Sequence, residues 1–174
     1  MWDRLAAARL CAFPLPPHGH CPNFAGAREA ARRLLAHPEV APLRTLIVGP
    51  ERALLPLRRL ALASGKVLYV PQGHREGWYW RVMDPAGAQL ARMAAVGEAV
   101  RHPGAAQAAV LACVAADRAG GRLGKGFGWG ARGLGLGLPE YTLAHPVMLL
   151  PALPCAPDSR VALIATPRGV VTAP

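Results

Sequence analysis

Short apolar runs, separated by helical patterns, constrain the fold of this chain more than any other feature. Ala108–Val114 is apolar throughout and lacks the alternation of a strand with one face in water. Leu43–Val48 and Val67–Val70 are predicted as further buried strands. Such strands are typical of a mostly parallel sheet covered on both faces. The remaining predicted strands are Trp78–Met83, Thr142–Leu149, Val161–Ala165 and Gly169–Thr172, the last closing a terminal hairpin.

Helical patterns lie between these strands. Ala25–Ala36 places its apolar residues on one face, and Arg52–Ser64 is followed by Gly65, a residue that commonly ends helices. A short helix is expected over Asp3–Ala12 and a weaker one over Ala86–Ala95. Strands that alternate with helices predict an α/β fold, a three-layer α/β/α arrangement around a mostly parallel sheet.

The bulk composition indicates a soluble intracellular protein. A chain of 174 residues fits one domain, because domains cluster near ~100–150 residues. The four cysteines form no CxxC pair, which favours reduced thiols over a disulfide framework. No apolar run approaches the ~20 residues that span a bilayer, and no signal peptide is visible. We therefore expect a single cytoplasmic domain whose oligomeric state the sequence does not determine.

The formal net charge is +10, and arginine supplies nearly all of it, because Lys66 and Lys125 are the only lysines. A surface of this sign attracts nucleotides, other anionic small molecules and nucleic acid. The arginines are scattered, however, and no RNA-recognition motif is present. Nucleic acid therefore ranks below a small anion as the expected partner.

The most informative segment is glycine-rich and basic, and it runs from Asp117 to Arg132 directly after the strand Ala108–Val114. Ligands of open α/β sheets bind beyond the carboxyl ends of strands. Alternating glycines let backbone N–H groups converge on an oxyanion, and Arg122 and Lys125 add positive charge. The spacing is not that of a Walker A loop. The segment predicts an anion site with a nucleotide phosphate as the favoured anion; a mobile glycine-rich surface loop is the alternative.

The segment Ala115–Gly128 resembles the signature of the 5-formyltetrahydrofolate cyclo-ligase family, A-F-D-x-x-G-x-R-L-G-x-G-x-G. Pro22–Ala31 is similar to the P-N-F-x-G-A-x-x-A-A pattern of a divergent, cyclo-ligase-like branch, and Arg58–Pro71 fits its R-x-x-x-L-x-x-G-K-x-x-x-x-P spacing. The resemblance implies a three-layer α/β/α fold. It also implies an ATP- and Mg²⁺-dependent conversion of 5-formyltetrahydrofolate to 5,10-methenyltetrahydrofolate, with ATP and a reduced folate as partners.

The same resemblance implies roles for individual residues. Phosphoryl transfer needs positioning and neutralisation of charge more than an acid–base pair. Ala131 stands where the family pattern has an Mg²⁺-binding Asp, so an active enzyme and a degenerate member are both open. The implied roles are catalysis by Arg122 and Lys125, cofactor binding by Gly124, Gly126, Phe127, Gly128, Trp129, Arg132 and Arg58, and metal binding by Asp117 and Asp158.

Other residues have two interpretations each. Asp117 either contacts a ligand or metal or caps the turn into the glycine-rich segment. Arg58 is either solvated or in contact with a ligand. The cluster of His18, His20 and Cys21 suits zinc, although an ordinary polar loop is favoured because no second pair lies at a recognised spacing.

Trp78, Tyr79 and Trp80 lie beside Arg75 and Arg81, a combination that can stack on a pterin, a purine or an unpaired base. An ordinary strand with its aromatics divided between core and surface is the favoured interpretation. At the level of function, a non-catalytic protein that binds a nucleotide, a phosphorylated metabolite or RNA is the alternative to the enzyme. A purely structural α/β protein is the third hypothesis.

Overall fold

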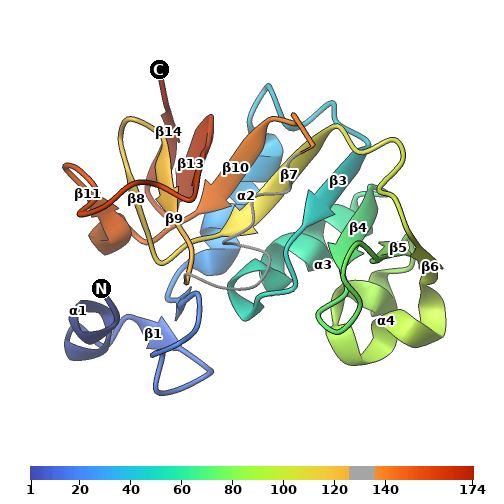
Figure 1. Ribbon diagram of the computed structural model, residues 1–174, viewed down its shortest axis with the longest axis horizontal. Coiled ribbons are helices and arrows are strands. Elements are labelled where there is room, and N and C mark those ends of the chain that lie inside the picture. Colours follow the sequence, from blue (N-terminus) through green and yellow to red (C-terminus); the bar gives the residue numbers. More distant parts are fainter. Residues whose placement is uncertain (126–135) are drawn as a thin grey trace.

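The computed structural model describes residues 1–125 and 136–174. Within them the centre of the molecule is an eight-stranded sheet in the order β14-β13-β10-β7-β3-β4-β5-β6 (Figure 1). The neighbours from β13 to β4 pair in parallel, and the strands at both edges pair antiparallel. The predicted α/β fold with a mostly parallel sheet is confirmed. The strands are β3 Thr45–Val48, β4 Val67–Pro71, β5 Tyr79–Val82, β6 Glu98–Val100, β7 Ala108–Ala112, β10 Glu140–Leu143, β13 Leu163–Thr166 and β14 Gly169–Thr172.

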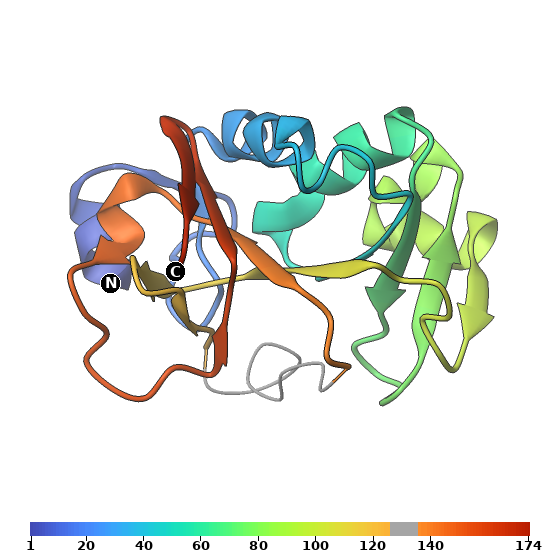
Figure 2. The same ribbon diagram turned by 90° about the horizontal axis from the view of Figure 1, so that it is seen from above.

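Three helices, α2 (Ala27–Ala36), α3 (Leu55–Ala63) and α4 (Leu90–Val96), lie along one face of this sheet (Figure 2). The main hydrophobic core is on that face, where Leu46 and Val48 of β3 meet the helices. The opposite face carries a smaller cluster built from residues such as Ile47 and Tyr69. The helices α2, α3 and α4 thus all cover the same face of the sheet. The strands are nevertheless buried on both sides, as their apolar sequence predicts.

Helix α2 shows how the sequence pattern determines a helix and how packing determines the residue that precedes it. Ala27, Ala30, Ala31 and Leu34 are buried, which is the spacing of one helical face. Gly26 precedes the helix in the left-handed conformation, and a Cβ on it would lie 2.6 Å from Pro167 Cγ. Glycine is therefore required at this position by both conformation and space.

A second, four-stranded sheet continues from the first, in the order β11-β8-β9-β12 within the described residues. Its strands are β8 Ala115–Asp117, β9 Gly121–Leu123, β11 Leu149–Leu150 and β12 Ser159–Arg160. The β8–β9 turn begins the glycine-rich segment. Gly120 is left-handed there, and a Cβ on it would lie 2.6 Å from the backbone oxygen of Val161.

Several predicted boundaries differ from the structure. The strand predicted over Thr142–Leu149 is wrong, because β10 ends at Leu143 and Pro146 starts a short 3₁₀ helix, η3 (Pro146–Met148). The predicted helix Asp3–Ala12 is α1 (Trp2–Ala7) alone, and strand β1 (Cys11–Ala12) then pairs with β2 (Asn23–Phe24).

The segment predicted as helix Arg52–Ser64 begins with a 3₁₀ turn, η1 (Arg52–Leu54), before α3. Likewise, η2 (Pro85–Ala88) precedes α4 where one helix over Ala86–Ala95 was predicted. Across the described part of the chain, every helix is too short or too polar to cross a membrane.

Candidate functional site

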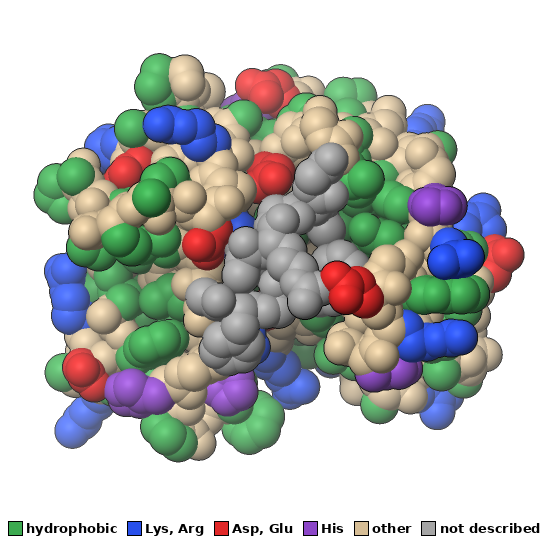
Figure 3. Space-filling view, viewed as in Figure 1, with side chains coloured by type: hydrophobic (Ala, Val, Ile, Leu, Met, Phe, Trp, Pro, Cys, Tyr) green, Lys and Arg blue, Asp and Glu red, His purple; other side chains and the backbone are tan. Residues whose placement is uncertain are grey.

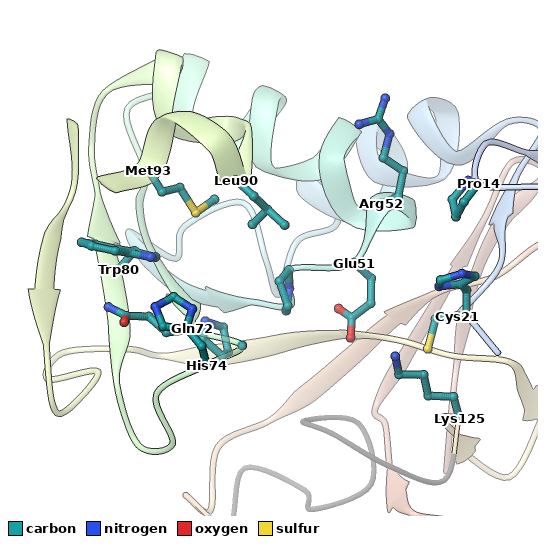
Figure 4. A pocket seen from close by; sticks show the side chains of 14 residues that line it. Pro14, Cys21, Glu51, Arg52, Gln72, His74, Trp80, Leu90, Met93 and Lys125 are labelled. Atoms are coloured by element: carbon teal, nitrogen blue, oxygen red, sulfur yellow. The ribbon is translucent and has the colours of Figure 1, made fainter. Parts of the chain in front are cut away.

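A cavity of about 550 Å³ opens at the carboxyl ends of β3 and β4 (Figure 4). Strand β3 lies between β4 and β7. The strand order runs outward from β3 to β4 on one side and from β7 to β10 on the other, and open α/β sheets bind ligands at such a point of reversal. Its walls come from the segments after β3 and β4, from β5 and α4, from the loop before β2, and from Lys125 after β9. The fold thus brings together residues from six separate parts of the sequence.

Glu51 is the acidic group of this cavity and the third residue after the end of β3. Its Oε2 atom is buried and has no hydrogen-bond partner in the described chain. Gly49 makes room for the carboxylate, because a Cβ at that position would lie 2.2 Å from Oε2. Burial raises the pKa of Glu51, while the positive charges of Arg58, Lys125 and Arg122 act in the opposite direction. The cavity therefore contains an acceptor group for a ligand that carries N–H donors.

Lys125 lies on the wall opposite Glu51, and Figure 4 shows its ammonium group and the Cys21 thiol pointing toward the same part of the cavity as the Glu51 carboxylate. Burial, followed by the nearby Glu51 charge, raises the pKa of Cys21 far above its ordinary value. This thiol therefore stays protonated at neutral pH and is unsuited to act as a nucleophile.

Arg122 is completely buried behind this group. Its Nε donates to Ser159 Oγ at 2.9 Å and its NH1 donates to the Ala112 carbonyl at 2.9 Å. Its charge favours the ionised forms of both Glu51 and Cys21. In this position Arg122 joins β9 to β7 and places positive charge behind the cavity.

Arg58 of α3 is also buried, with only 2% of its surface exposed. Its guanidinium donates to the carbonyls of Gly49 at 2.7 Å, Glu51 at 3.1 Å and Ala88 at 3.0 Å. Burial lowers its pKa to about 10, so it remains charged at neutral pH. These bonds hold the backbone that carries Glu51, so Arg58 is a positioning residue. They also explain the burial of its guanidinium without a contact to a ligand.

The two predicted metal ligands are both bonded to the backbone. Asp117 accepts from Gly121 N at 2.9 Å and from Leu153 N at 3.4 Å, so both of its oxygens are engaged. Asp158 uses Oδ2 to accept from Gly124 N at 2.6 Å, and its other oxygen forms no bond within the described residues. Over residues 1–125 and 136–174, no three His, Cys, Asp or Glu side chains gather as a metal cluster.

The predicted cofactor-binding residues of the glycine-rich segment divide between two groups. Gly124 precedes Lys125 and is held by Asp158 as described above. The remaining five, Gly126, Phe127, Gly128, Trp129 and Arg132, lie outside the described residues.

The other half of the cavity is apolar and aromatic. Trp80 of β5 and Met93 of α4 point into it, with Gln72 and His74 below them (Figure 4). The favoured interpretation of the Trp78–Trp80 segment is confirmed in part, because Tyr79 is buried in the smaller core. Trp80, by contrast, lines the cavity.

The side chains of His18, His20 and Cys21, for which a polar loop was the favoured interpretation, do not gather at one point. His20 and Cys21 line the cavity, whereas His18 is bonded to Asp3 at 2.8 Å. Glu51, Gln72 and Met93 were not singled out by sequence reasoning. For Glu51 a signal existed, namely an acidic residue three positions after a buried strand of a parallel sheet.

Comparison with known proteins gives a family for this geometry. A model of the 5-formyltetrahydrofolate cyclo-ligase family matches residues 15–167. The mouse methenyltetrahydrofolate synthase domain-containing protein is 30% identical over 196 aligned positions, which cover 99% of this chain and 53% of the relative. Its bovine counterpart is 29% identical and is covered to 52%. The chain therefore spans about half the length of these curated relatives.

Two solved structures share the fold. The 5,10-methenyltetrahydrofolate synthetase of Aquifex aeolicus superposes with a TM-score of 0.65 at 24% identity, covering 84% of this chain and 80% of that one. The synthetase of Mycoplasma pneumoniae gives a TM-score of 0.53 at 11% identity, with 94% of each chain covered. Because the family model spans most of the chain, this protein belongs to the 5-formyltetrahydrofolate cyclo-ligase family.

Proposed function

We propose that this protein binds ATP, Mg²⁺ and a reduced folate, and converts 5-formyltetrahydrofolate to 5,10-methenyltetrahydrofolate. The observation that carries the proposal is the buried Glu51 oxygen without a hydrogen-bond partner, which faces the cavity opposite Lys125. An acceptor left open in this way favours a ligand that supplies donors, because a buried unpaired oxygen is otherwise costly.

The pterin ring of a reduced folate matches the acidic and aromatic parts of the cavity. Its 2-amino group and N3–H can both donate to one carboxylate, which is the arrangement that Glu51 offers. Trp80 and Met93 provide an aromatic and a polarisable surface for the flat ring system. We assign Glu51 to ring recognition, so it holds the substrate without touching the reacting carbon.

The nucleotide belongs on the side of Lys125. This residue follows Gly124 at the start of the glycine-rich segment, and its ammonium can neutralise phosphate charge. Magnesium in nucleotide sites is commonly held by one or two carboxylates together with phosphate oxygens. Asp158 is the better placed of the two predicted ligands, because it keeps one oxygen without a hydrogen bond in the described chain.

The proposed reaction balances with ATP as the phosphoryl donor. The formyl oxygen attacks the γ-phosphorus, and ADP leaves. Nitrogen N10 then attacks the activated formyl carbon and the five-membered ring closes. N10 gives up its proton to the departing inorganic phosphate, which leaves with the former formyl oxygen. Charge develops on phosphate oxygens throughout, which suits a site whose main contribution is positioned positive charge from Lys125 and Arg122.

Replacing Glu51 with Gln tests this assignment. Because Glu51 is assigned to the ring and not to the reacting atoms, the loss should appear mainly as a higher KM. We expect kcat/KM to fall roughly 10- to 100-fold, the cost of one charged hydrogen-bonded contact. Formation of methenyltetrahydrofolate is followed by its absorbance, with ATP and Mg²⁺ saturating.

The matched control is Glu39→Gln, an exposed glutamate outside the cavity, which should leave both constants unchanged. Equal kinetics for Glu51→Gln and wild type would remove Glu51 from the substrate site. Absence of turnover in the wild type, with ATP binding retained, would reduce the protein to a binding protein.

That non-catalytic alternative is supported by one observation, the Ala131 that replaces the Mg²⁺-binding Asp of the family pattern. In this case the cavity would bind a nucleotide or a related phosphorylated metabolite without turnover, and RNA ranks lower. For either function we propose a cytoplasmic location, which the four free cysteines support.

A further inference from the structure

Arg52 stands where two cavities meet. It lines the main cavity and also a smaller one of about 280 Å³, and the two share Pro50, Arg52 and Leu90. The smaller cavity extends beside α3 and the start of α4, away from Lys125. A ligand longer than the main cavity therefore passes Arg52 if it continues along this path.

The Arg52 guanidinium is available to such a ligand. It lies 5.5 Å from the centre of the Phe13 ring, a contact that orients it without using its N–H donors. Among residues 1–125 and 136–174, no side chain or carbonyl forms a hydrogen bond or ion pair with it. Phe13 is itself 68% exposed, and Arg52 lines the cavity beside Pro14, the next residue in the chain.

The surroundings of Arg52 are positively charged. Arg52 and Arg59 both act to lower the pKa of Arg58, which places three guanidinium groups in one neighbourhood. The nearest acidic residue in sequence, Glu51, points the other way, toward Cys21 and Lys125 (Figure 4). The cavity lining thus includes an acceptor, Glu51, and next to it in the chain a cation, Arg52, that has no hydrogen-bond or ion-pair partner in the described chain.

We propose that Arg52 binds a carboxylate at the tail of the ligand whose ring Glu51 holds, and so selects ligands that carry an anionic tail. This inference rests on the proposed function, since the glutamyl part of a reduced folate supplies that carboxylate. A planar guanidinium with free donors is the side chain best suited to a carboxylate. Arg52 acts here as a specificity-determining residue and takes no part in the chemical steps.

A second pair of arginines is the alternative partner for a carboxylate. Arg75 and Arg101 lie over the Trp78 ring, at 4.3 Å and 5.9 Å from its centre. Figure 3 shows blue and purple side chains gathered on the right of the viewed face. Arg101 and His102 line a different cavity, which shares no lining residue with the main one. Arg52 is favoured over them because it lines the main cavity directly.

The experiment compares 5-formyltetrahydrofolate with its dimethyl ester, which has the same ring and length but no carboxylates. Calorimetry measures the binding of both ligands to wild type, Arg52→Gln, the control Arg59→Gln, and the variant Arg75→Gln with Arg101→Gln. Wild type and the control should bind the free acid about threefold to tenfold more tightly than the ester. Arg52→Gln should lose this preference, while its affinity for the ester stays unchanged. Added salt should weaken the preference of wild type.

Each outcome decides between the proposals. An unchanged preference in Arg52→Gln overturns the role of Arg52, as does a preference lost in the Arg75 and Arg101 variant instead. Equal weakening of acid and ester in Arg52→Gln also overturns it, because that result reports altered cavity shape. A wild type that binds neither ligand overturns the proposed function together with this inference. An unchanged melting temperature confirms that Arg52→Gln is folded.

Discussion

At the scale of single residues, the site depends on the Glu51 carboxylate, whose burial costs folding free energy. Glu51 loses hydration on burial, and its Oε2 finds no donor in the described chain. The same residue is the best candidate for ligand recognition. Glycine at position 49 is part of this arrangement, because any side chain there would occupy the space of the carboxylate. Stability and binding are therefore expected to oppose each other at Glu51.

The stability of the protein should depend on pH through this residue. Burial raises the pKa of Glu51 above its ordinary value of 4.5, so the folded protein holds the proton more tightly than the unfolded chain. The corresponding stability is complete below pH 4.5 and is lost as the pH rises through the folded-state pKa. Glu51→Gln cannot titrate, so its free energy of unfolding relative to wild type should be larger at pH 7 than at pH 4.

Urea unfolding between pH 4 and pH 8 measures this difference, with Glu39→Gln as the matched control. Parallel stability profiles for wild type and Glu51→Gln would show that burial does not perturb this carboxyl group.

At the scale of elements, two buried arginines connect segments that are distant in sequence. Arg58 joins α3 to the loop after β3 and to η2, and Arg122 joins β9 to β7 and β12. Each guanidinium satisfies backbone carbonyls or a side chain that would otherwise be buried without donors. The loop that carries Glu51 is thus held from behind by a charged group.

Loss of the Arg58 guanidinium should cost stability because the carbonyls of Gly49 and Ala88 lose this donor, while the Glu51 carbonyl keeps the N–H of Leu54. We expect Arg58→Ala to lower the free energy of unfolding by about 2–4 kcal/mol. Arg59→Ala, an exposed position on the same helix, should change it by less than about 0.5 kcal/mol. Urea denaturation compares the two variants, and similar values for both would contradict the structural role of Arg58.

At the scale of the whole molecule, the segments after β3 and β4 of the large sheet meet the segment after β9 of the small sheet, and the cavity is the result. The excess of arginine gives this molecule a positive field that favours anionic ligands in that cavity. If ATP with Mg²⁺ binds there, it should stabilise the folded state by mass action.

At about 100 times the dissociation constant this stabilisation is about 2.7 kcal/mol, which corresponds to a rise in Tm of roughly 5–10 °C. Thermal unfolding with ATP and Mg²⁺ measures it, with sodium sulfate at equal ionic strength as the control. Lys125→Ala should reduce the shift. A shift of the same size with sulfate alone would indicate a general anion effect instead of a nucleotide site.

Local chemistry in the sequence was sufficient for the fold class and the family. The apolar run Ala108–Val114 predicted a buried strand, and burial on both faces needs only its own side chains. The motif from Ala115 to Gly128 pointed to the cyclo-ligase family, which the family model confirms. The ends of elements were predicted less well. The predicted strand ran on to Leu149, whereas β10 ends at Leu143, because a short strand ends where its pairing partner does.

The sequence by itself determined the main strands and helices, the sign of the charge and the family motif, because these follow from neighbouring residues and composition. Only the tertiary structure decided which residues meet. It placed Glu51 opposite Lys125, 74 positions away in the sequence, and left Arg52 at a junction of two cavities. It also turned Arg58 and Arg122 inward to backbone carbonyls. Burial and the direction of a side chain depend on packing between distant segments, which no local pattern contains.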